Sequence, residues 1–449
     1  MSKTKYEING RDFYINNKLT YQEIPNVNPK ALGLLFNARF IQGAFKDYNP
    51  ENKNVYNRFG KVFDADRNTA ELIEALPDWH NAGLRAITVG LQGGGPIYSF
   101  TDWGCVQTNS FSSDGRTLNP DTWRRMVSII KAADEIGMLV IVSFFYQAQF
   151  QYFENDFAAI DASKTVCEAL CALEYDNVII EIANEYDTLT MHSKETALAK
   201  HVNMASWIKK VQEWTGKRFA VGASAAFRAD KDVIQASDIS IIHGNMKRRQ
   251  ELNDFARAVR SWAPDQPIVI NEDSPMFTQL EVAIDNHFSW GYYNNMTKQE
   301  PPCDWGITRG EDEYFVYRMA EVIGIEMPNM DEDSMYLQGF EPDMSIDGGR
   351  YIRLASRRPE RIDRVMFYED DELIYTAYAE PFMLYGKTTW IQEPYYPNKT
   401  AEKFKVVVKK LNGKTFEIEQ DMRDLPKADV SKAHNPSPFN DANAGLPNV

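Results

Sequence analysis

Short apolar runs and longer amphipathic segments alternate along most of the chain, and this alternation is what most limits its possible folds. The short runs have the composition of buried strands, and the segments between them repeat apolar residues with helical spacing. Eight β-then-α units of this kind predict an α/β protein built on a (β/α)8 barrel, with its functional groups at the C-terminal ends of the strands. A doubly wound open sheet is the alternative that the pattern leaves open. The eight predicted strands are residues 32–40, 84–91, 138–146, 178–185, 218–224, 239–245, 267–273 and 287–293.

The intervening segments carry helix start and stop signals. In residues 119–137, Asn119 is a capping residue, Pro120 suits the first helical position and Gly137 suits the end of the helix. The remaining predicted helices are residues 69–83, 161–175, 197–216, 248–263 and 311–324.

Different patterns flank this region. Residues 1–30 contain a short hairpin pattern with an Asn-Asn turn, which we expect to cap the N-terminal face of a barrel formed by residues 31–327. After about Pro328 the helical periodicity stops. Short strands separated by turn residues then predict a β-sandwich over residues 328–425.

Three details refine the C-terminal part. Asn412-Gly413 lies between alternating strands and predicts a hairpin, and residues 388–393 are predicted to form another strand. Residues 367–382 resemble the pattern of bacterial immunoglobulin-like modules that are often appended to carbohydrate-active enzymes. Residues 426–449 are polar and rich in Pro, Asn and Ala, so we expect an extended tail without a core of its own.

The bulk composition excludes several classes of function. The chain has 449 residues and a formal charge of −15, which argues against a nucleic-acid partner and disfavours binding to anionic lipid. No apolar run approaches the roughly 20 residues of a membrane helix. The start lacks the apolar core of a secretion signal, so we expect a cytoplasmic protein, or a secreted or periplasmic one if a signal has been removed. The four cysteines show no metal-binding spacing, and the sequence leaves the oligomeric state open.

Two carboxylates are predicted at the same end of the barrel. In the stretch VIIEIANEYD, alternation places Glu181 and Glu185 on one face of the fourth strand, with Glu185 at its C-terminal lip. Glu272 ends the seventh strand in PIVINED. Such a pair suits retaining glycoside hydrolysis, in which a protonated carboxyl group serves the leaving oxygen and an ionised one, about 5–5.5 Å away, attacks the anomeric carbon. The alternative is two structural carboxylates in ion pairs at the barrel rim.

These motifs carry a family resemblance. Glu-x-x-Asn-Glu at the end of strand four, with a Glu at the end of strand seven, resembles clan A of the glycoside hydrolases, near the cellulase-like family 5. The resemblance implies that Glu185 is the acid/base, Asn184 the partner of the sugar 2-hydroxyl, and Glu272 the nucleophile. Family 5 usually has Pro at position 186, where this chain has Tyr, and Phe-Gly after the nucleophile, where this chain has Asp273-Ser274. The His expected on strand three is missing, so a divergent clan A family is predicted.

Further candidates lie at other strand ends. His243 on strand six matches a His common in the clan and could touch the nucleophile or a sugar, the alternative being a structural rim histidine. Trp290 on strand eight occupies the place where clan A enzymes commonly have an aromatic floor beneath the sugar, the alternative being core packing. Arg39 on strand one could orient and ionise the nucleophile. Asn37, Tyr146 and Gln147 are weaker lining candidates, as is Trp103 in the long loop after strand two.

The leading prediction is a retaining β-glycosidase that acts on an oligo- or polysaccharide without a metal or cofactor. A non-catalytic carbohydrate-binding barrel is the first alternative; it would have its carboxylates too far apart or blocked by Tyr186 or Asp273. A barrel enzyme of another class, such as a lyase or isomerase, is the second. It would need a metal cluster or a Schiff-base lysine at a strand end, and neither pattern is present in the sequence.

Overall fold

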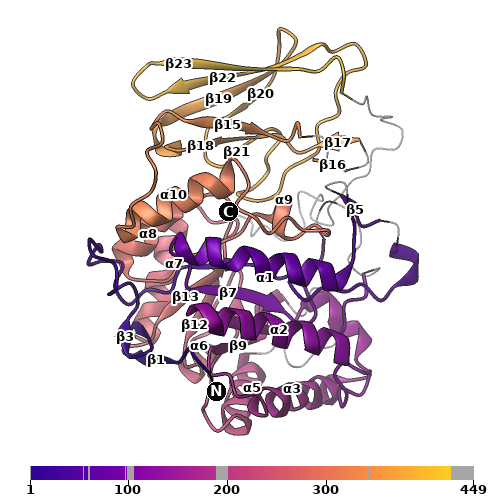
Figure 1. Cartoon of the computed structure of the whole chain (residues 1–449), viewed down its shortest axis with the longest axis vertical. Helices are drawn as coiled ribbons and strands as arrows, with labels where there is room; N and C mark the ends of the chain where they lie inside the picture. Colours follow the sequence, from indigo (N-terminus) through magenta and orange to yellow (C-terminus); the bar gives the residue numbers. More distant parts are fainter. Residues whose placement is uncertain are drawn as a thin grey trace.

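Figure 1 shows a lower body, in which helices surround strands, and an upper body made of sheets. The structure is a computed structural model that describes residues 2–53, 55–58, 61–96, 98, 106–188, 201–341, 344–346 and 348–425.

The strands of the lower body close into a parallel barrel. One sheet has the order β10-β9-β8-β7-β4-β14 and a second has the order β11-β12-β13. The two sheets are joined at both ends, because β10 and β11 are one strand interrupted at Ala223 and a parallel bridge links Val269 of β13 to Ser289, just before β14. All eight predicted strands are present in sequence order around the barrel, so the (β/α)8 prediction is confirmed and an open sheet is excluded. The strands are β4 (Asn37–Arg39), β7 (Ala86–Gly90), β8 (Leu139–Phe145), β9 (Val178–Ala183), β10 (Ala220–Gly222), β11 (Ser224–Ala225), β12 (Ser240–His243), β13 (Ile268–Glu272) and β14 (Gly291–Tyr292).

Helices follow the strands and cover the barrel. The helix after β7 begins as predicted: the side chain of Asn119 accepts hydrogen bonds from two backbone N–H groups, and Gly137 ends the helix with a φ of +84°. Two helices that follow strands five and seven, α6 and α8, are too short for a clear sequence period and were not predicted. The helices are α1 (Ala65–Asn81), α2 (Pro120–Ile136), α3 (Asp156–Cys171), α5 (His201–Trp214), α6 (Lys231–Ala236), α7 (Arg249–Trp262), α8 (Gln279–Asn286), α9 (Asn295–Lys298) and α10 (Glu311–Ile323).

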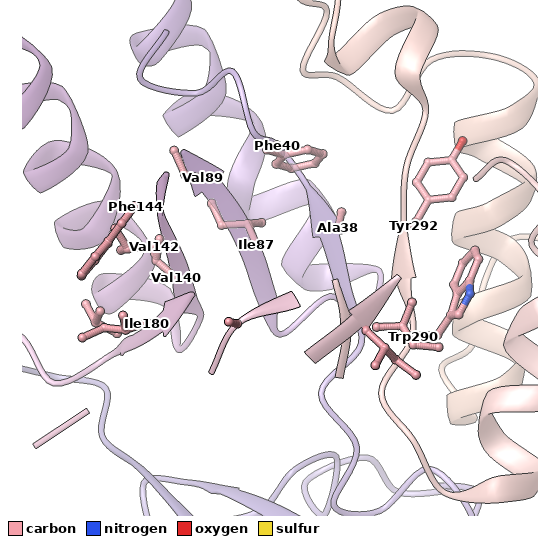
Figure 2. Close-up of a cluster of buried hydrophobic side chains, with 14 of the residues drawn as sticks. Ala38, Phe40, Ile87, Val89, Val140, Val142, Phe144, Ile180, Trp290 and Tyr292 are labelled. Atoms are coloured by element: carbon pink, nitrogen blue, oxygen red, sulfur yellow. The ribbon is translucent and has the colours of Figure 1, made fainter. Parts of the chain in front are cut away.

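The outward strand residues form the main core with these helices. Figure 2 shows part of this layer, in which alternate residues such as Ile87, Val89, Val140 and Val142 project from one side of their strands. Because side chains alternate along a strand, the neighbouring positions point into the barrel. This alternation decides which residues can reach a site at the barrel mouth.

The lower part of the barrel interior is apolar and is closed by the N-terminal segment. Phe13 is fully buried among inward-facing residues that include Leu35, Leu139 and Ile241. It belongs to a small antiparallel sheet whose Asn-Asn turn has positive φ at both residues, as the sequence predicted. Tyr6 of this sheet donates a hydrogen bond to the carbonyl of Val178 at the start of β9. The strands of this sheet are β1 (Tyr6–Asn9), β2 (Asp12–Ile15) and β3 (Lys18–Leu19).

The upper body consists mainly of two antiparallel sheets, with the orders β15-β18-β21 and β20-β19-β22-β23, packed on a shared core. Leu354 and Phe382 of the first sheet contact the same cluster as Phe367 and Val406 of the second. This arrangement is a β-sandwich, as predicted; its immunoglobulin-like character and the domain boundaries stay predictions. The strands are β15 (Met335–Gln338), β18 (Arg353–Ser356), β19 (Ile362–Glu369), β20 (Glu372–Ala377), β21 (Phe382–Met383), β22 (Lys403–Lys410) and β23 (Thr415–Asp421), and β16 (Ser345–Ile346) forms a small hairpin with β17 (Gly349–Arg350). Outside this body, between β4 and α1, β5 (Asn57–Arg58) pairs with β6 (Lys61–Val62).

One C-terminal prediction is wrong. Residues 388–393 form a tight loop instead of a strand, because the backbone turns back on itself and the N–H of Lys387 donates to the carbonyl of Ile391. The Asn412-Gly413 hairpin between β22 and β23 is confirmed. The predicted tail, residues 426–449, lies outside the described residues. Among the described helices, none has both the length and the apolar character that crossing a membrane requires.

Candidate active site

The barrel interior changes from apolar to polar toward the C-terminal ends of the strands. Glu181, His243 and Asn271 are fully buried there, above the layer that contains Phe13. Glu181 accepts a hydrogen bond from the amide of Asn271 at 3.0 Å and lies 3.9 Å from Nε2 of His243. Burial raises the pKa of Glu181, but His243 and Arg39 outweigh this effect and lower it to about 2. Glu181 is therefore a buried negative charge beneath the strand ends.

Glu185 follows the end of β9 in a constrained backbone conformation. Its φ is +49°, an uncommon value for a residue with a side chain, and its N–H donates to the hydroxyl of Ser224 at 2.9 Å. The side chain is 17% exposed. One carboxylate oxygen accepts a hydrogen bond from the amide of Gln147 at 2.7 Å, and the other lies 2.9 Å from Nδ1 of His243. Residues that follow strand three and end strand six thus hold this carboxylate at the rim.

Glu272 ends β13 and is held by different partners. Nε of Arg39 lies 2.7 Å from its Oε2, and the side-chain amide of Asn245 donates to its Oε1 at 2.8 Å. Arg39 also donates to the side chain of Asn184 at 2.5 Å, and Asn184 in turn donates to Gln147 at 3.1 Å. A continuous hydrogen-bonded chain therefore links the two carboxylates through strands one, three and four.

His243 lies between the carboxylates. Its Nδ1 is 2.9 Å from Glu185 and 3.5 Å from Glu272. One oxygen of each carboxylate and one nitrogen of His243 all lie within 4.8 Å of one another. Burial lowers the pKa of His243, but Glu272, Glu181 and Glu185 outweigh it and raise the pKa to about 9. The imidazole is therefore charged at neutral pH.

The charge preferences of the two carboxylates differ from the sequence expectation. Burial raises the pKa of Glu185, yet the hydrogen bond and charge of His243 outweigh burial, so the net shift is downward. Burial raises the pKa of Glu272 most strongly and the neighbouring carboxylates add to this rise, so the net shift is upward although Arg39 and His243 lower it. The expected neutral Glu185 thus favours its charged form in the free protein, because a protonated histidine lies beside it.

A partly enclosed cavity opens over this cluster. Its wall combines the two carboxylates with amides, one guanidinium and several aromatic rings, which is the mixture that sugar recognition needs. One of those rings, Trp390, comes from the C-terminal module. The described residues that line the cavity are Arg39, Ile41, Gly94, Tyr146, Gln147, Asn184, Glu185, Thr188, Phe227, Asn245, Met246, Glu272, Tyr293, Gln299 and Trp390.

Several predicted site residues meet at this cavity and others do not. Arg39, Asn184 and Tyr146 line it together with both carboxylates, and His243 lies directly behind the carboxylates. Asn37 does not line it, because its amide donates to three backbone carbonyls between neighbouring strands. Trp103 lies outside the described residues.

Trp290 does not provide the floor expected of it. The indole is fully buried, donates to Asp273 at 2.7 Å and packs on Phe315 of α10, on the outer side of the barrel (Figure 2). At the next position, Gly291, an added Cβ would lie 2.3 Å from a backbone oxygen, so that inward position takes no side chain. The following inward residue, Tyr293, lines the cavity instead.

Sequence reasoning missed Asn245, Tyr293, Phe227 and Trp390. Asn245 stands two residues after His243, and strict alternation from that histidine could have found it. Phe227 follows strand five, and three consecutive backbone N–H groups beginning at Ala226 are held by the carboxylate of Asp187. No local sequence pattern indicated that Trp390 lines the cavity, because Trp390 belongs to the C-terminal module and not to the barrel.

The same cluster bears on metal binding. Glu185, His243 and Glu272 are the described residues grouped closely enough to offer three ligand atoms to one ion. The guanidinium of Arg39 already occupies one side of Glu272, and the charged imidazole occupies one side of Glu185. Because both positive groups repel a cation, these residues fit a metal ion poorly.

No protein-family model matches the chain, and no curated protein sequence matches it. Among solved structures, it is similar to an endo-β-1,4-mannanase from Thermotoga petrophila, with 11% identity, 86% of this chain and 97% of that chain covered, and a TM-score of 0.44. It is also similar to a glycoside hydrolase of family 5 from Bacteroides vulgatus, with 12% identity, coverage of 86% and 90%, and a TM-score of 0.45. An aphid myrosinase has 9% identity, coverage of 67% and 100%, and a TM-score of 0.46.

Proposed function

We propose that this chain is a retaining β-glycoside hydrolase that acts on an oligo- or polysaccharide. The observation that supports this best is the approach of Glu185 and Glu272, whose nearest grouped oxygens lie within 4.8 Å across one cavity. Retaining enzymes hold their two carboxyl groups about 5–5.5 Å apart, because one must reach the sugar carbon directly, whereas inverting enzymes leave room for a water molecule.

In this proposal Glu272 is the nucleophile. The ion pair with Arg39 and the hydrogen bond from Asn245 hold it in place, and the charge of Arg39 offsets part of the cost of burying its charged form. One oxygen of Glu272 bonds to the anomeric carbon as the bond from that carbon to the leaving oxygen breaks. The product of this step is a glycosyl-enzyme ester.

Glu185 is the acid and base, and His243 supplies the proton that Glu185 lacks in the free protein. The imidazole holds this proton at Nδ1, 2.9 Å from the carboxylate. As the leaving oxygen gains negative charge, the proton passes from Nδ1 to Glu185 and from Glu185 to that oxygen. In the second step Glu185 removes a proton from water, the hydroxide oxygen bonds to the anomeric carbon, and the ester bond to Glu272 breaks.

The structure also bears on the non-catalytic alternative. Tyr186 is fully buried and its hydroxyl accepts a hydrogen bond from the N–H of Asp230. Asp273 is fully buried and bonded to Trp290. Neither is among the described residues that line the cavity, so neither blocks the gap between the carboxylates, which favours the catalytic proposal.

Two substitutions test the assignment. On an activated aryl β-glycoside, Glu272→Ala is expected to lower turnover by on the order of 10⁴-fold or more, because no covalent intermediate can form. Glu185→Ala slows turnover, and added azide partly restores it by attacking the glycosyl-enzyme in place of activated water. Rates that match the unsubstituted chain in both variants would refute the proposal. Retention of activity in a chelating buffer is the expected control for chemistry without a metal.

A further inference from the structure

We propose that Trp390, carried by the C-terminal module, is a sugar-binding platform of the active-site cavity, so that this module takes part in selecting the glycan. The inference rests on the proposed function and extends it to substrate recognition. The ligand class is a pyranose ring, whose C–H face stacks on indole while its hydroxyls reach the neighbouring amides.

The position of Trp390 in the chain makes its presence in the cavity notable. Of the described residues that line the cavity, all others belong to the barrel and end with Gln299, whereas Trp390 follows β21 of the sandwich. The residue is 8% exposed, so most of its surface is packed, and it lines the cavity together with both carboxylates. A core residue of the sandwich would be expected in the cluster around Phe367, and Trp390 instead packs in a separate cluster with Tyr98 and Tyr146 of the barrel.

A short loop presents the indole. Residues 386–392 begin and end in an antiparallel bridge between Gly386 and Gln392. The hydroxyl of Thr388 accepts a hydrogen bond from the N–H of Ile391 at 3.0 Å and so ties the two sides of the loop together. The tip of the loop, which includes Thr389 and Trp390, is thereby fixed before any ligand binds. Such preorganisation lowers the entropic cost of binding.

The tip is also bonded to the barrel rim. The hydroxyl of Thr389 accepts a hydrogen bond from the N–H of Met246, which follows strand six and lines the cavity. The carbonyl of Trp390 accepts hydrogen bonds from Tyr98 at 3.2 Å and from the side chain of Asn295 at 2.9 Å. Three separate barrel segments therefore hold the loop tip that carries the indole.

A buried ion pair holds the two bodies together behind this loop. Arg353 of β18 lies 3.2 Å from Glu311 of α10, and both side chains are at most 5% exposed. The same guanidinium donates to Tyr98 at 2.9 Å, to Asn295 at 3.1 Å and to Gln392 at 3.0 Å. Since Tyr98 and Asn295 also bind the carbonyl of Trp390, one network fixes the module and the indole together. The module is therefore built into the wall of the site.

The variants Trp390→Ala, Trp390→Leu and Trp390→Phe of the full chain test this inference. The probes are cello-, manno-, xylo- and laminari-oligosaccharides, with steady-state kinetics for any that are cleaved and calorimetry for any that only bind. Loss of the stacking face is expected to raise KM or Kd about tenfold in both the Ala and the Leu variant, with kcat changed less than threefold. Trp390→Phe is expected to stay within about threefold, because it keeps an aromatic face.

Tyr378→Ala is the matched control, since Tyr378 is an aromatic residue of the same module that is 72% exposed and absent from the cavity wall. Its KM and Kd are expected to equal those of the unsubstituted chain. If Trp390 only filled space, Trp390→Leu would have the same KM and Kd as Trp390→Phe. That result would refute the proposal that Trp390 is a sugar-binding platform. If no oligosaccharide is cleaved, the proposed function fails. The Kd values of the Trp390 variants, each divided by that of the unsubstituted chain, still decide the role of Trp390. If none binds either, the platform is refuted as well.

Discussion

The two ends of the barrel interior are made by the same strands but have opposite chemistry. At the N-terminal end, Phe13 and the residues around it are apolar and buried. At the C-terminal end, Glu181, Glu185, His243 and Glu272 crowd together with Arg39. Burial of apolar surface stabilises the first end, whereas the second end gathers charges that burial disfavours. One end therefore stabilises the barrel, whereas the other carries an electrostatic cost at the site proposed for catalysis.

Of the three substitutions that test the comparison between the two ends, Phe13→Ala gives the largest expected effect. The fully buried ring plugs the lower interior, so its removal leaves a cavity and lowers the free energy of unfolding by about 3–5 kcal/mol. Because Phe13 lies at the far end from the carboxylates, kcat/KM measured below the unfolding transition is expected to stay unchanged. Urea titration followed by a kinetic assay checks both. Tyr14→Ala, on the partly exposed face of the same strand, is the control, and we expect it to lower the free energy of unfolding far less. Equal losses of unfolding free energy in the two variants would contradict the conclusion that Phe13 fills the lower barrel interior.

Asn245→Ala probes the opposite end. This side chain donates a hydrogen bond to the proposed nucleophile Glu272, and a hydrogen bond to a charged group is worth about 1.5–3 kcal/mol. We expect kcat/KM to fall roughly 10- to 100-fold, with a change in unfolding free energy smaller than that of Phe13→Ala. A variant that loses stability and keeps its activity would reverse the comparison between the two ends.

Glu181→Gln probes the boundary between the two ends and gives the smallest expected effect. Glu181 helps to raise the pKa of His243 to about 9, so the variant brings that pKa back toward its usual value of 6.5. The proton that His243 holds is present below its pKa and is lost above it. The alkaline limb of kcat/KM is therefore expected near pH 9 in the unsubstituted chain and about one unit lower in the variant, with little change at pH 6.

A pH–rate profile from pH 5 to 10 measures this shift. Glu168→Gln on α3, where the side chain is 69% exposed, is the charge-matched control and should leave the limb in place. An unmoved limb in Glu181→Gln would remove His243 as the source of the proton.

Much of the fold was predictable because its signals are local. The period of apolar residues gave the eight strands, and positive φ at Asn16 and Asn17 follows from turn chemistry within a few residues. The positions of Glu185 and Glu272 at strand ends followed from the same periodicity, so their approach across the cavity was expected from the sequence.

Tertiary structure decided the rest of the site. Tyr293 takes the position expected of Trp290 because the inward face at Gly291 has no room for a side chain. The downward pKa shift of Glu185 depends on a histidine 58 residues away in the sequence. Trp390, which lines the same cavity, belongs to the C-terminal module. Periodicity and turns are properties of neighbouring residues, and the sequence determines them by itself. The lining and the charge state of a cavity depend on packing and burial between distant segments, which exist only once the chain has folded.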